Sequence, residues 1–265
     1  MRYRLSQFFV GALLVIFLAG CATSPGEFEP LQGRNGMDRV SPVRAAEVNT
    51  RLGIGYMERG QLQLAIEKLQ TALSHDSAHT PARLTLALIY DRLGESEAAS
   101  QQYQRASQLA PGDGPTQNAF AVHLCQQGRF ADADRHFQRA VNDAFYATPE
   151  IAYSNAGSCA RRAGEVEAAE RYLRQALRID PDYPDALFQL AELQFAAGDA
   201  FRARAFLQRL ETATEADPAA LILGYRIEQK LNNPDQAERY AMRLERLFPQ
   251  SLQARELRSL RQGDD

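Results

Sequence analysis

Residues 86–99 read LALIYDRLGESEAA, residues 120–133 read FAVHLCQQGRFADA, and residues 190–203 read LAELQFAAGDAFRA. Each stretch has an alanine in second place, a glycine seven residues after it, and another alanine five residues after the glycine. Apolar residues at helical spacing flank the glycine on both sides, and glycine suits the left-handed backbone that ends a helix. Each stretch therefore predicts a pair of helices joined by a sharp turn.

The same pattern runs through the chain from residue 46 onward. The glycines follow one another at steps of 34, 34, 36 and 34, and Asn232 takes the sixth place after another 34 residues; they are Gly60, Gly94, Gly128, Gly164 and Gly198. Five residues after each of these positions stands an alanine, namely Ala65, Ala99, Ala133, Ala169, Ala203 and Ala237. Two helices per 34 residues is the tetratricopeptide pattern.

We therefore predict an all-α, right-handed superhelical solenoid of six tetratricopeptide helix pairs within residues 45–265. The repeats are placed near residues 46–79, 80–113, 114–147, 150–183, 184–217 and 218–251, and residues 252–262 are expected to form a capping helix that carries Leu252, Leu257 and Leu260. Small residues in the eighth position of the first five repeats would let paired helices approach closely; they are Gly53, Ala87, Ala121, Gly157 and Ala191. The sixth repeat departs from this rule, because Gly224 stands one position early.

Repeats 3 and 4 are separated by two residues more than the period allows, near Thr148 and Pro149. The segment 142–149 also carries two aromatic residues, Phe145 and Tyr146. A tolerated surface insertion explains this departure as well as a functional one does.

The N-terminus has the layout of a bacterial secretory signal. Arg2 and Arg4 precede an apolar run from Phe8 to Leu18, and Ala19-Gly20-Cys21 follows. The run is shorter than the roughly 20 residues of a membrane span. The small residues before Cys21 resemble the lipobox of bacterial lipoproteins, in which the signal is cut before a cysteine that then carries lipid. We expect residues 1–20 to be the signal and residues 21–44, with their prolines and glycines, to be a flexible tether. An uncleaved anchor ending in a chance cysteine is the alternative.

The composition excludes several classes of protein. The chain has 265 residues, a formal charge of −3 and 45% hydrophobic residues, so it is globular and lacks the basic field of nucleic-acid binders. His-Glu-x-x-His, Gly-x-Ser-x-Gly and phosphate-loop patterns are all absent from the sequence. His75 and His79 are four residues apart without a third ligand nearby. We therefore expect no enzyme, no metal site, no cofactor beyond lipid on Cys21, and no small-molecule substrate.

Cys125 and Cys159 form an even pair once Cys21 is lipidated. They take position 12 of repeat 3 and position 10 of repeat 4, which lie about 200° apart around a helix. Neighbouring first helices could turn these two flanks towards each other, and disulfides persist in an oxidising periplasm. We predict a disulfide, with two buried free thiols as the alternative.

A more specific resemblance lies in repeats 3 and 4. Leu124-Cys125 and Gly128 are followed by Tyr146 and by Asn155-Ala156-Gly157-x-Cys159-Ala160. With a lipobox, a tether and six repeats, the chain resembles the type IV pilus biogenesis lipoproteins called PilF or PilW. The resemblance implies a pilotin, which helps the pilus secretin reach and assemble in the outer membrane. Ala22 after the lipidated cysteine, by resemblance to sorted lipoproteins, implies the outer membrane facing the periplasm. An adaptor for a periplasmic protease or cell-wall enzyme, and a barrel-assembly subunit, remain alternatives.

First helices line the inside of a tetratricopeptide superhelix, so a partner groove is expected there. The inward positions of the N-terminal repeats are apolar, whereas those of repeat 4 are more polar; the apolar ones include Ile54, Met57, Leu84, Leu88 and Val122. Such a row predicts a groove for an amphipathic or extended peptide. Packing between neighbouring repeats is the alternative role for these side chains.

Overall fold

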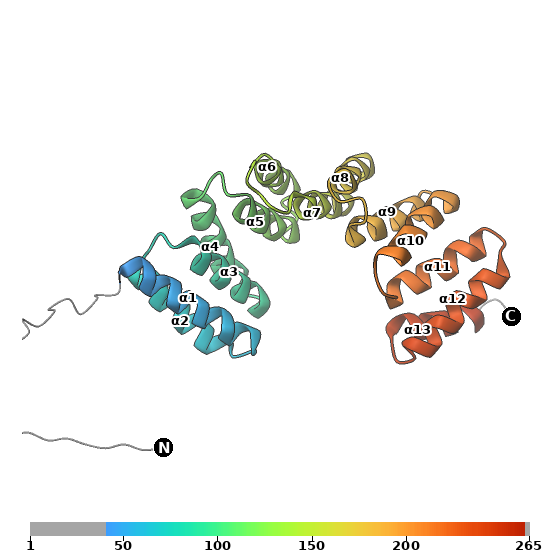
Figure 1. Ribbon diagram of the computed structural model, residues 1–265, viewed down its shortest axis with the longest axis horizontal. Coiled ribbons are helices and arrows are strands. Elements are labelled where there is room, and N and C mark those ends of the chain that lie inside the picture. The colour runs from blue at the N-terminus through green and yellow to red at the C-terminus, as the bar shows by residue number, and fades with distance from the viewer. Residues whose placement is uncertain (1–40, 263–265) are drawn as a thin grey trace, which may run out of the picture. The chain divides into compact units, whose positions relative to one another are not determined.

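The computed structural model describes residues 41–262 (Figure 1). Across this range the chain forms thirteen α-helices and no strand: α1 Pro42–Glu58, α2 Leu62–His75, α3 Thr80–Leu93, α4 Ser96–Leu109, α5 Gly114–Gln126, α6 Phe130–Val141, α7 Pro149–Arg162, α8 Val166–Ile179, α9 Pro184–Ala196, α10 Ala200–Ala213, α11 Pro218–Lys230, α12 Pro234–Leu247 and α13 Leu252–Gln262. Each odd-numbered helix through α11 packs against the helix that follows it, and first helices of successive repeats also contact one another. The predicted all-α repeat architecture is confirmed.

The repeat turns have the backbone geometry that the period predicts. Positive φ angles occur at all five turn glycines and, among the other described residues, at Asn232 alone, with φ of 54°. Asparagine tolerates the left-handed region better than other residues that carry a Cβ. Asn232 therefore replaces the sixth glycine without changing the turn.

Proline marks the beginning of all six first helices. Each of these helices has a proline at its first or second position. Proline suits this place because its fixed φ is helical and its missing N–H would be unpaired there in any case. The first of these helices begins at Pro42, where the Ser41 hydroxyl accepts a hydrogen bond of 3.2 Å from the Arg44 amide. The tether predicted through residue 44 was thus too long, and the repeat predicted from residue 46 begins earlier.

Close approach within a helix pair depends on a small residue opposite a large one. A Cβ added to Gly53 would lie 2.6 Å from Cγ of Leu69, and one added to Gly157 would lie 2.7 Å from Cγ of Leu173. The leucine thus occupies the space that a side chain on the glycine would need. A larger residue at either glycine would therefore require the facing leucine to move.

The last repeat also packs closely, but here the large residue is on the first helix and the small one is on the second helix. Tyr225 occupies the eighth position and is buried together with Ala241 in one apolar cluster. A Cβ added to the displaced Gly224 would lie 2.6 Å from the ring of Tyr240. The shifted glycine therefore accommodates the larger side chain of the second helix.

The extra residues between α6 and α7 are tied to the start of α5. The Gly114 amide donates a hydrogen bond of 2.8 Å to Oδ2 of Asp143, and the Tyr146 ring covers Gly114 so closely that an added Cβ would lie 2.7 Å away. Two backbone hydrogen bonds, from Gly114 and Phe145, lower the pKa of the Asp143 carboxyl. The Phe145 side chain itself is 95% exposed. Residues 142–149 therefore form an ordered connection between repeats 3 and 4, which is called the strap below.

The capping helix α13 closes the last repeat with fewer apolar contacts than predicted. Leu257 is fully buried beside Leu244, whereas Leu252 and Leu260 are exposed. Among the helices of residues 41–262, none combines the length and the apolar character needed to cross a membrane. The predicted signal, Cys21 and most of the tether lie outside the described residues.

Candidate protein-interaction surface

The apolar row predicted on the first helices runs through the ninth position of repeats 1 to 3. Ile54 lies on α1, Leu88 on α3 and Val122 on α5, and α3 contacts both of its neighbours in this series. In Figure 1, α5 and α7 lie on the inner side of the arc that the repeats follow, and α6 and α8 lie on its outer side. Leu88 is 39% exposed, while Ile54 and Val122 are half-buried.

The other predicted members contribute to packing as well. Met57 packs against the N-terminal apolar cluster that includes Leu69, and Leu84 and Val122 pack against the cluster that includes Tyr103. Met57, Leu84 and Val122 therefore contribute to packing between helices, which was the alternative expected for the row. Leu88 is the member whose side chain is most available to a partner.

The row changes character in repeat 4. The ninth position becomes Ser158, and Arg161 pairs with Glu192 of α9 at 2.6 Å. Ser154 takes the fifth position of repeat 4, one of the polar positions expected to face the groove, but it is fully buried and forms hydrogen bonds with Asp185 and Gln189. An apolar strip on repeats 1 to 3 thus gives way to a charged, hydrogen-bonded surface.

Cys125 and Cys159 lie at the junction between those two halves. They are buried on the facing flanks of α5 and α7, their Cα atoms are 5.8 Å apart, and a disulfide joins them. Nη1 of Arg162 lies 3.8 Å from Sγ of Cys125. The bond fastens repeat 3 to repeat 4 beside the predicted groove.

A polar network around the buried His123 fastens repeat 2 to repeat 3, and no pattern in the sequence predicts it. Nδ1 of His123 lies 2.9 Å from Oδ1 of Asp91, and its Nε2 lies 2.7 Å from the Ser100 hydroxyl. The side-chain amide of Gln127 contacts both Nε2 of His123, at 2.9 Å, and the Ser100 hydroxyl, at 2.8 Å. The Tyr103 ring packs 4.9 Å from the imidazole, centroid to centroid.

Asp91, His123 and Ser100 are hydrogen-bonded in the same succession as the Asp, His and Ser of a hydrolase triad. The surroundings of Ser100, however, do not suit nucleophilic catalysis. Ser100 lies within α4, where its own amide N–H belongs to the helix and cannot stabilise an oxyanion. His123 is almost completely buried, so a substrate would not reach it. The network satisfies buried polar groups and holds α3, α4 and α5 together.

Residues 41–262 contain no group of three or more His, Cys, Asp and Glu side chains that could hold a metal ion. His79 lies 3.8 Å from Asp76 across the turn between α2 and α3, and His75 is exposed. Ile54, Leu88 and Val122, at the ninth positions of the first helices of repeats 1 to 3, are called the first-helix strip below.

Two sequence profiles of the tetratricopeptide repeat family match this chain, one over residues 56–115 and 160–224 and the other over residues 118–184. The fold and the matched repeats show that the chain belongs to the tetratricopeptide repeat proteins. Within that class it is homologous to PilF and PilW, repeat proteins of type IV pilus biogenesis, and like them it is a non-catalytic scaffold.

The likeness to these relatives extends over nearly all of their length. The type IV pilus assembly protein PilF of Pseudomonas aeruginosa is 26% identical over 247 residues, which are 93% of this chain and 96% of PilF. The crystal structure of PilW, a widely conserved type IV pilus biogenesis factor, matches with a TM-score of 0.73 at 29% identity over 80% of this chain and 97% of PilW. The solved structure of PilF from Pseudomonas aeruginosa matches with a TM-score of 0.72 at 24% identity, over 82% of this chain and 98% of that chain.

Proposed function

We propose that this protein is a lipid-anchored pilotin of the outer membrane, which binds the type IV pilus secretin and promotes assembly of the secretin multimer. The observation that carries this proposal is the match to PilF over 93% of this chain and 96% of PilF. A match over one or two repeats would be compatible with unrelated proteins that share this repeat, whereas this match extends over nearly the whole length of both chains.

The first-helix strip provides the binding surface in this proposal. Leu88 offers an exposed apolar contact, Ile54 and Val122 continue the row, and the surface becomes polar at Ser158. An amphipathic or extended segment of the secretin would bury its apolar residues on repeats 1 to 3 and its polar residues against repeat 4. The Asp91–His123 pair would hold repeat 2 against repeat 3, and the disulfide would hold repeat 3 against repeat 4, so that the apolar and polar parts of this surface keep one arrangement.

The anchor in this proposal is lipid on Cys21, expected from the sequence of the N-terminal segment. Cys21→Ser would remove the acylated thiol, and we expect the protein to become soluble or to remain unprocessed. Fractionation of inner and outer membranes is the measurement. Unchanged fractionation of the variant with the outer membrane would contradict lipid anchoring.

Deletion of the gene in its own host tests the function itself. We expect secretin monomers to accumulate, secretin multimers to be lost and twitching motility to stop, while porin assembly continues. Pull-down from detergent-solubilised envelope, followed by mass spectrometry, should recover the secretin. Defective porin assembly would favour the barrel-assembly alternative, and recovery of a protease or cell-wall enzyme without the secretin would favour the adaptor.

A further inference from the structure

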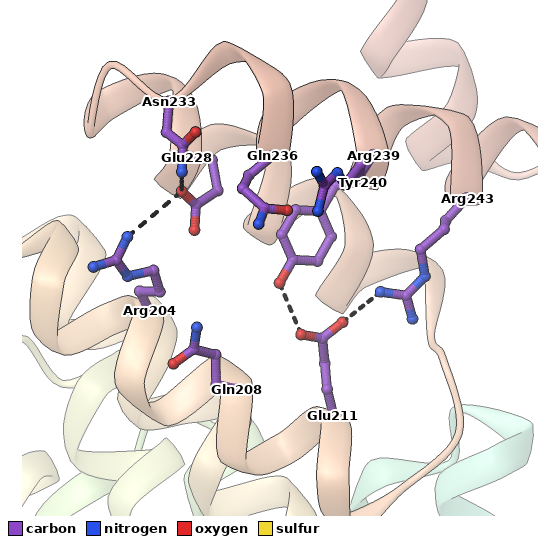
Figure 2. Close-up of a pocket in the computed structure, with 9 residues that line it drawn as sticks. All are labelled: Arg204, Gln208, Glu211, Glu228, Asn233, Gln236, Arg239, Tyr240 and Arg243. Atoms are coloured by element: carbon purple, nitrogen blue, oxygen red, sulfur yellow. Dashed lines mark hydrogen bonds and ion pairs between the residues drawn. The ribbon is translucent and has the colours of Figure 1, made fainter.

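A polar cavity of about 330 Å³ lies between the second helices of the last two repeats (Figure 2). It is formed by α10, by the C-terminal part of α11 and by α12 with the turn before it; the lining residues are Arg204, Gln208, Glu211, Glu228, Asn233, Gln236, Arg239, Tyr240 and Arg243. None of these residues belongs to the first-helix strip of repeats 1 to 3. The cavity is a separate surface of the molecule.

One wall of the cavity is fixed by the buried carboxylate of Glu228, which is 4% exposed. Its Oε2 accepts a hydrogen bond of 2.9 Å from Nδ2 of Asn233 and lies 3.7 Å from Nη1 of Arg204. A carboxylate this deeply buried requires such partners, because an unpaired charge there would be costly. The negative charge of Glu228 is therefore already neutralised.

The opposite wall is fixed by Glu211 of α10. Its carboxylate accepts a hydrogen bond of 2.8 Å from the Tyr240 hydroxyl and one of 2.6 Å from Nη1 of Arg243. Burial and the bond to Glu211 raise the pKa of Tyr240, so its hydroxyl remains a donor across the physiological range. Figure 2 shows these two bonded groups at either side of the cavity, with Gln208 and Gln236 between them.

The cavity also has lining polar groups that the described chain does not use, and two of them, Gln208 and Arg239, are exposed to solvent. Gln208, Gln236 and Arg239 line the cavity, and within residues 41–262 their side chains make no hydrogen bond or ion pair. A carboxamide both donates and accepts, which matches the peptide group of an extended backbone. Three arginines against two glutamates leave one positive charge here, in a chain whose formal charge is −3.

The basic surface continues along α12. A shallower hollow adjoins the cavity through Arg239 and Arg243 and is completed by Met242, Glu245 and Arg246. The Met242 side chain is 53% exposed. Beside the cavity there is thus room for a longer ligand, with an apolar contact between basic groups.

We propose that this cavity binds an extended acidic peptide segment of a second protein partner, with Gln208 and Gln236 holding the peptide backbone and Arg239 pairing with an acidic side chain. Charge complementarity selects an acidic ligand, and the two carboxamides between fixed walls favour a peptide over a lipid headgroup. The site goes beyond the proposed secretin-binding role, because it lies on α10 and α12 and uses none of the residues of the first-helix strip.

Fluorescence anisotropy tests this proposal with the full-length protein in detergent. The probe is a fluorescein-labelled peptide of alternating glutamate and alanine, and the control peptide has glutamine in place of glutamate. We expect the glutamate peptide to bind and Arg239→Gln to weaken its binding by roughly tenfold, the scale of one lost charged hydrogen bond. Gln236→Ala should also weaken binding of this peptide.

Arg171→Gln is the matched control, because Arg171 is exposed on α8, another second helix, and lines none of the cavities described above. Its binding should stay close to that of the unmodified protein. Equal weakening by both arginine variants would show a general charge effect and overturn the site, as would a wild-type protein that does not bind the glutamate peptide. Binding to phosphatidylglycerol vesicles that Arg239→Gln abolishes, without peptide binding, would overturn it in favour of a lipid site. None of these readouts involves the secretin, so failure here and failure of the proposed function are distinguishable.

Discussion

Oδ1 of Asp91 lies 2.9 Å from Nδ1 of His123, and this pair occupies the same two repeat positions as Cys125 and Cys159 one repeat later. Each link joins position 12 of one repeat to position 10 of the next. An ion pair or hydrogen bond therefore fastens repeat 2 to repeat 3 at the place where a disulfide fastens repeat 3 to repeat 4. Three consecutive repeats are joined along the side of the predicted groove.

The first link can be measured through the stability of the fold. Asp91→Asn leaves the buried His123 with a neutral and weaker acceptor, and we expect a loss of about 1 to 3 kcal/mol in the free energy of unfolding, the scale of a hydrogen bond to a charged group. In a double-mutant cycle with His123→Gln, the measured coupling should exceed about 0.5 kcal/mol. If the effects of the two substitutions on the free energy of urea unfolding are strictly additive, the interaction between Asp91 and His123 does not stabilise the fold.

The second link predicts sensitivity to reduction. The loop between Cys125 and Cys159 spans 34 residues, and closing a loop of this length is worth up to about 4 kcal/mol in the chain-entropy model. Peptide mapping without reductant should recover the linked peptides, and dithiothreitol should lower the urea midpoint of the wild type. The Cys125→Ser/Cys159→Ser variant should not respond to dithiothreitol. Two alkylated free thiols in protein taken from the periplasm would contradict the bond.

The contact between the strap and α5 can be tested at Gly114, and Gly112 provides the control. Gly114→Ala places a Cβ 2.7 Å from the Tyr146 ring, whereas Gly112→Ala meets open space. We expect Gly114→Ala to lower the free energy of unfolding by about 1 to 3 kcal/mol through overpacking and Gly112→Ala to leave it nearly unchanged. Tyr146→Ala should relieve the clash in the double variant. Equal stability of the two alanine variants would mean that the strap does not pack on α5.

His136 gives the fold a predictable pH dependence. Burial, followed by the nearby Arg139 and Arg135, lowers the pKa of this histidine below its ordinary value of 6.5, and its Nδ1 lies 2.7 Å from Oε1 of Gln117. Below pH 6.5 the unfolded chain therefore binds a proton that the folded chain resists. The free energy of unfolding should fall as the pH drops from 6.5 towards the lowered pKa, and this part of the slope should vanish in His136→Gln. The measurement covers about one pH unit on either side of 6.5, from about pH 7.5 to 5.5. If the free energies of unfolding of the wild type and of His136→Gln change in parallel over this range, His136 is not the source of the pH dependence.

The repeat architecture could be predicted because its signals are local. A glycine such as Gly94 specifies a left-handed turn by its own backbone, and the alanine that follows it marks close packing within the same pair. The early beginning of α1 is harder to predict, because Pro42 follows a run of prolines and glycines typical of a tether, although every first helix has a proline at its first or second position. The exchange of sizes between Tyr225 and Ala241 requires two helices at once, and spacing along one helix does not reveal it.

The exposure of the first-helix side chains is harder to predict from sequence than the fold, for a physical reason. An apolar side chain on a first helix can face a partner or a neighbouring repeat, and sequence spacing places Leu84 and Leu88 on nearly the same side. The structure separates them, since Leu84 packs against a core cluster while Leu88 remains exposed. No sequence pattern predicts the cavity between α10 and α12, because common polar residues from two separate segments, 204–211 and 228–243, line it.

Leu88 tests the central claim that the first-helix strip binds the secretin. Leu88→Glu places a charge on the strip, and Leu93→Glu places the same charge on another side of α3, where the leucine is also exposed. Both variants should retain helicity and thermal stability close to those of the wild type, which Met57→Glu, at a packed position, need not do.

The decisive measurement is the amount of secretin multimer in outer membranes from cells that carry each variant in place of the wild-type protein. We predict that Leu88→Glu abolishes or strongly reduces the multimer, since a charge at a central contact costs a few kcal/mol of binding, and that Leu93→Glu supports the wild-type amount. Full multimer assembly with a folded Leu88→Glu protein would contradict the account and place the secretin-binding surface elsewhere.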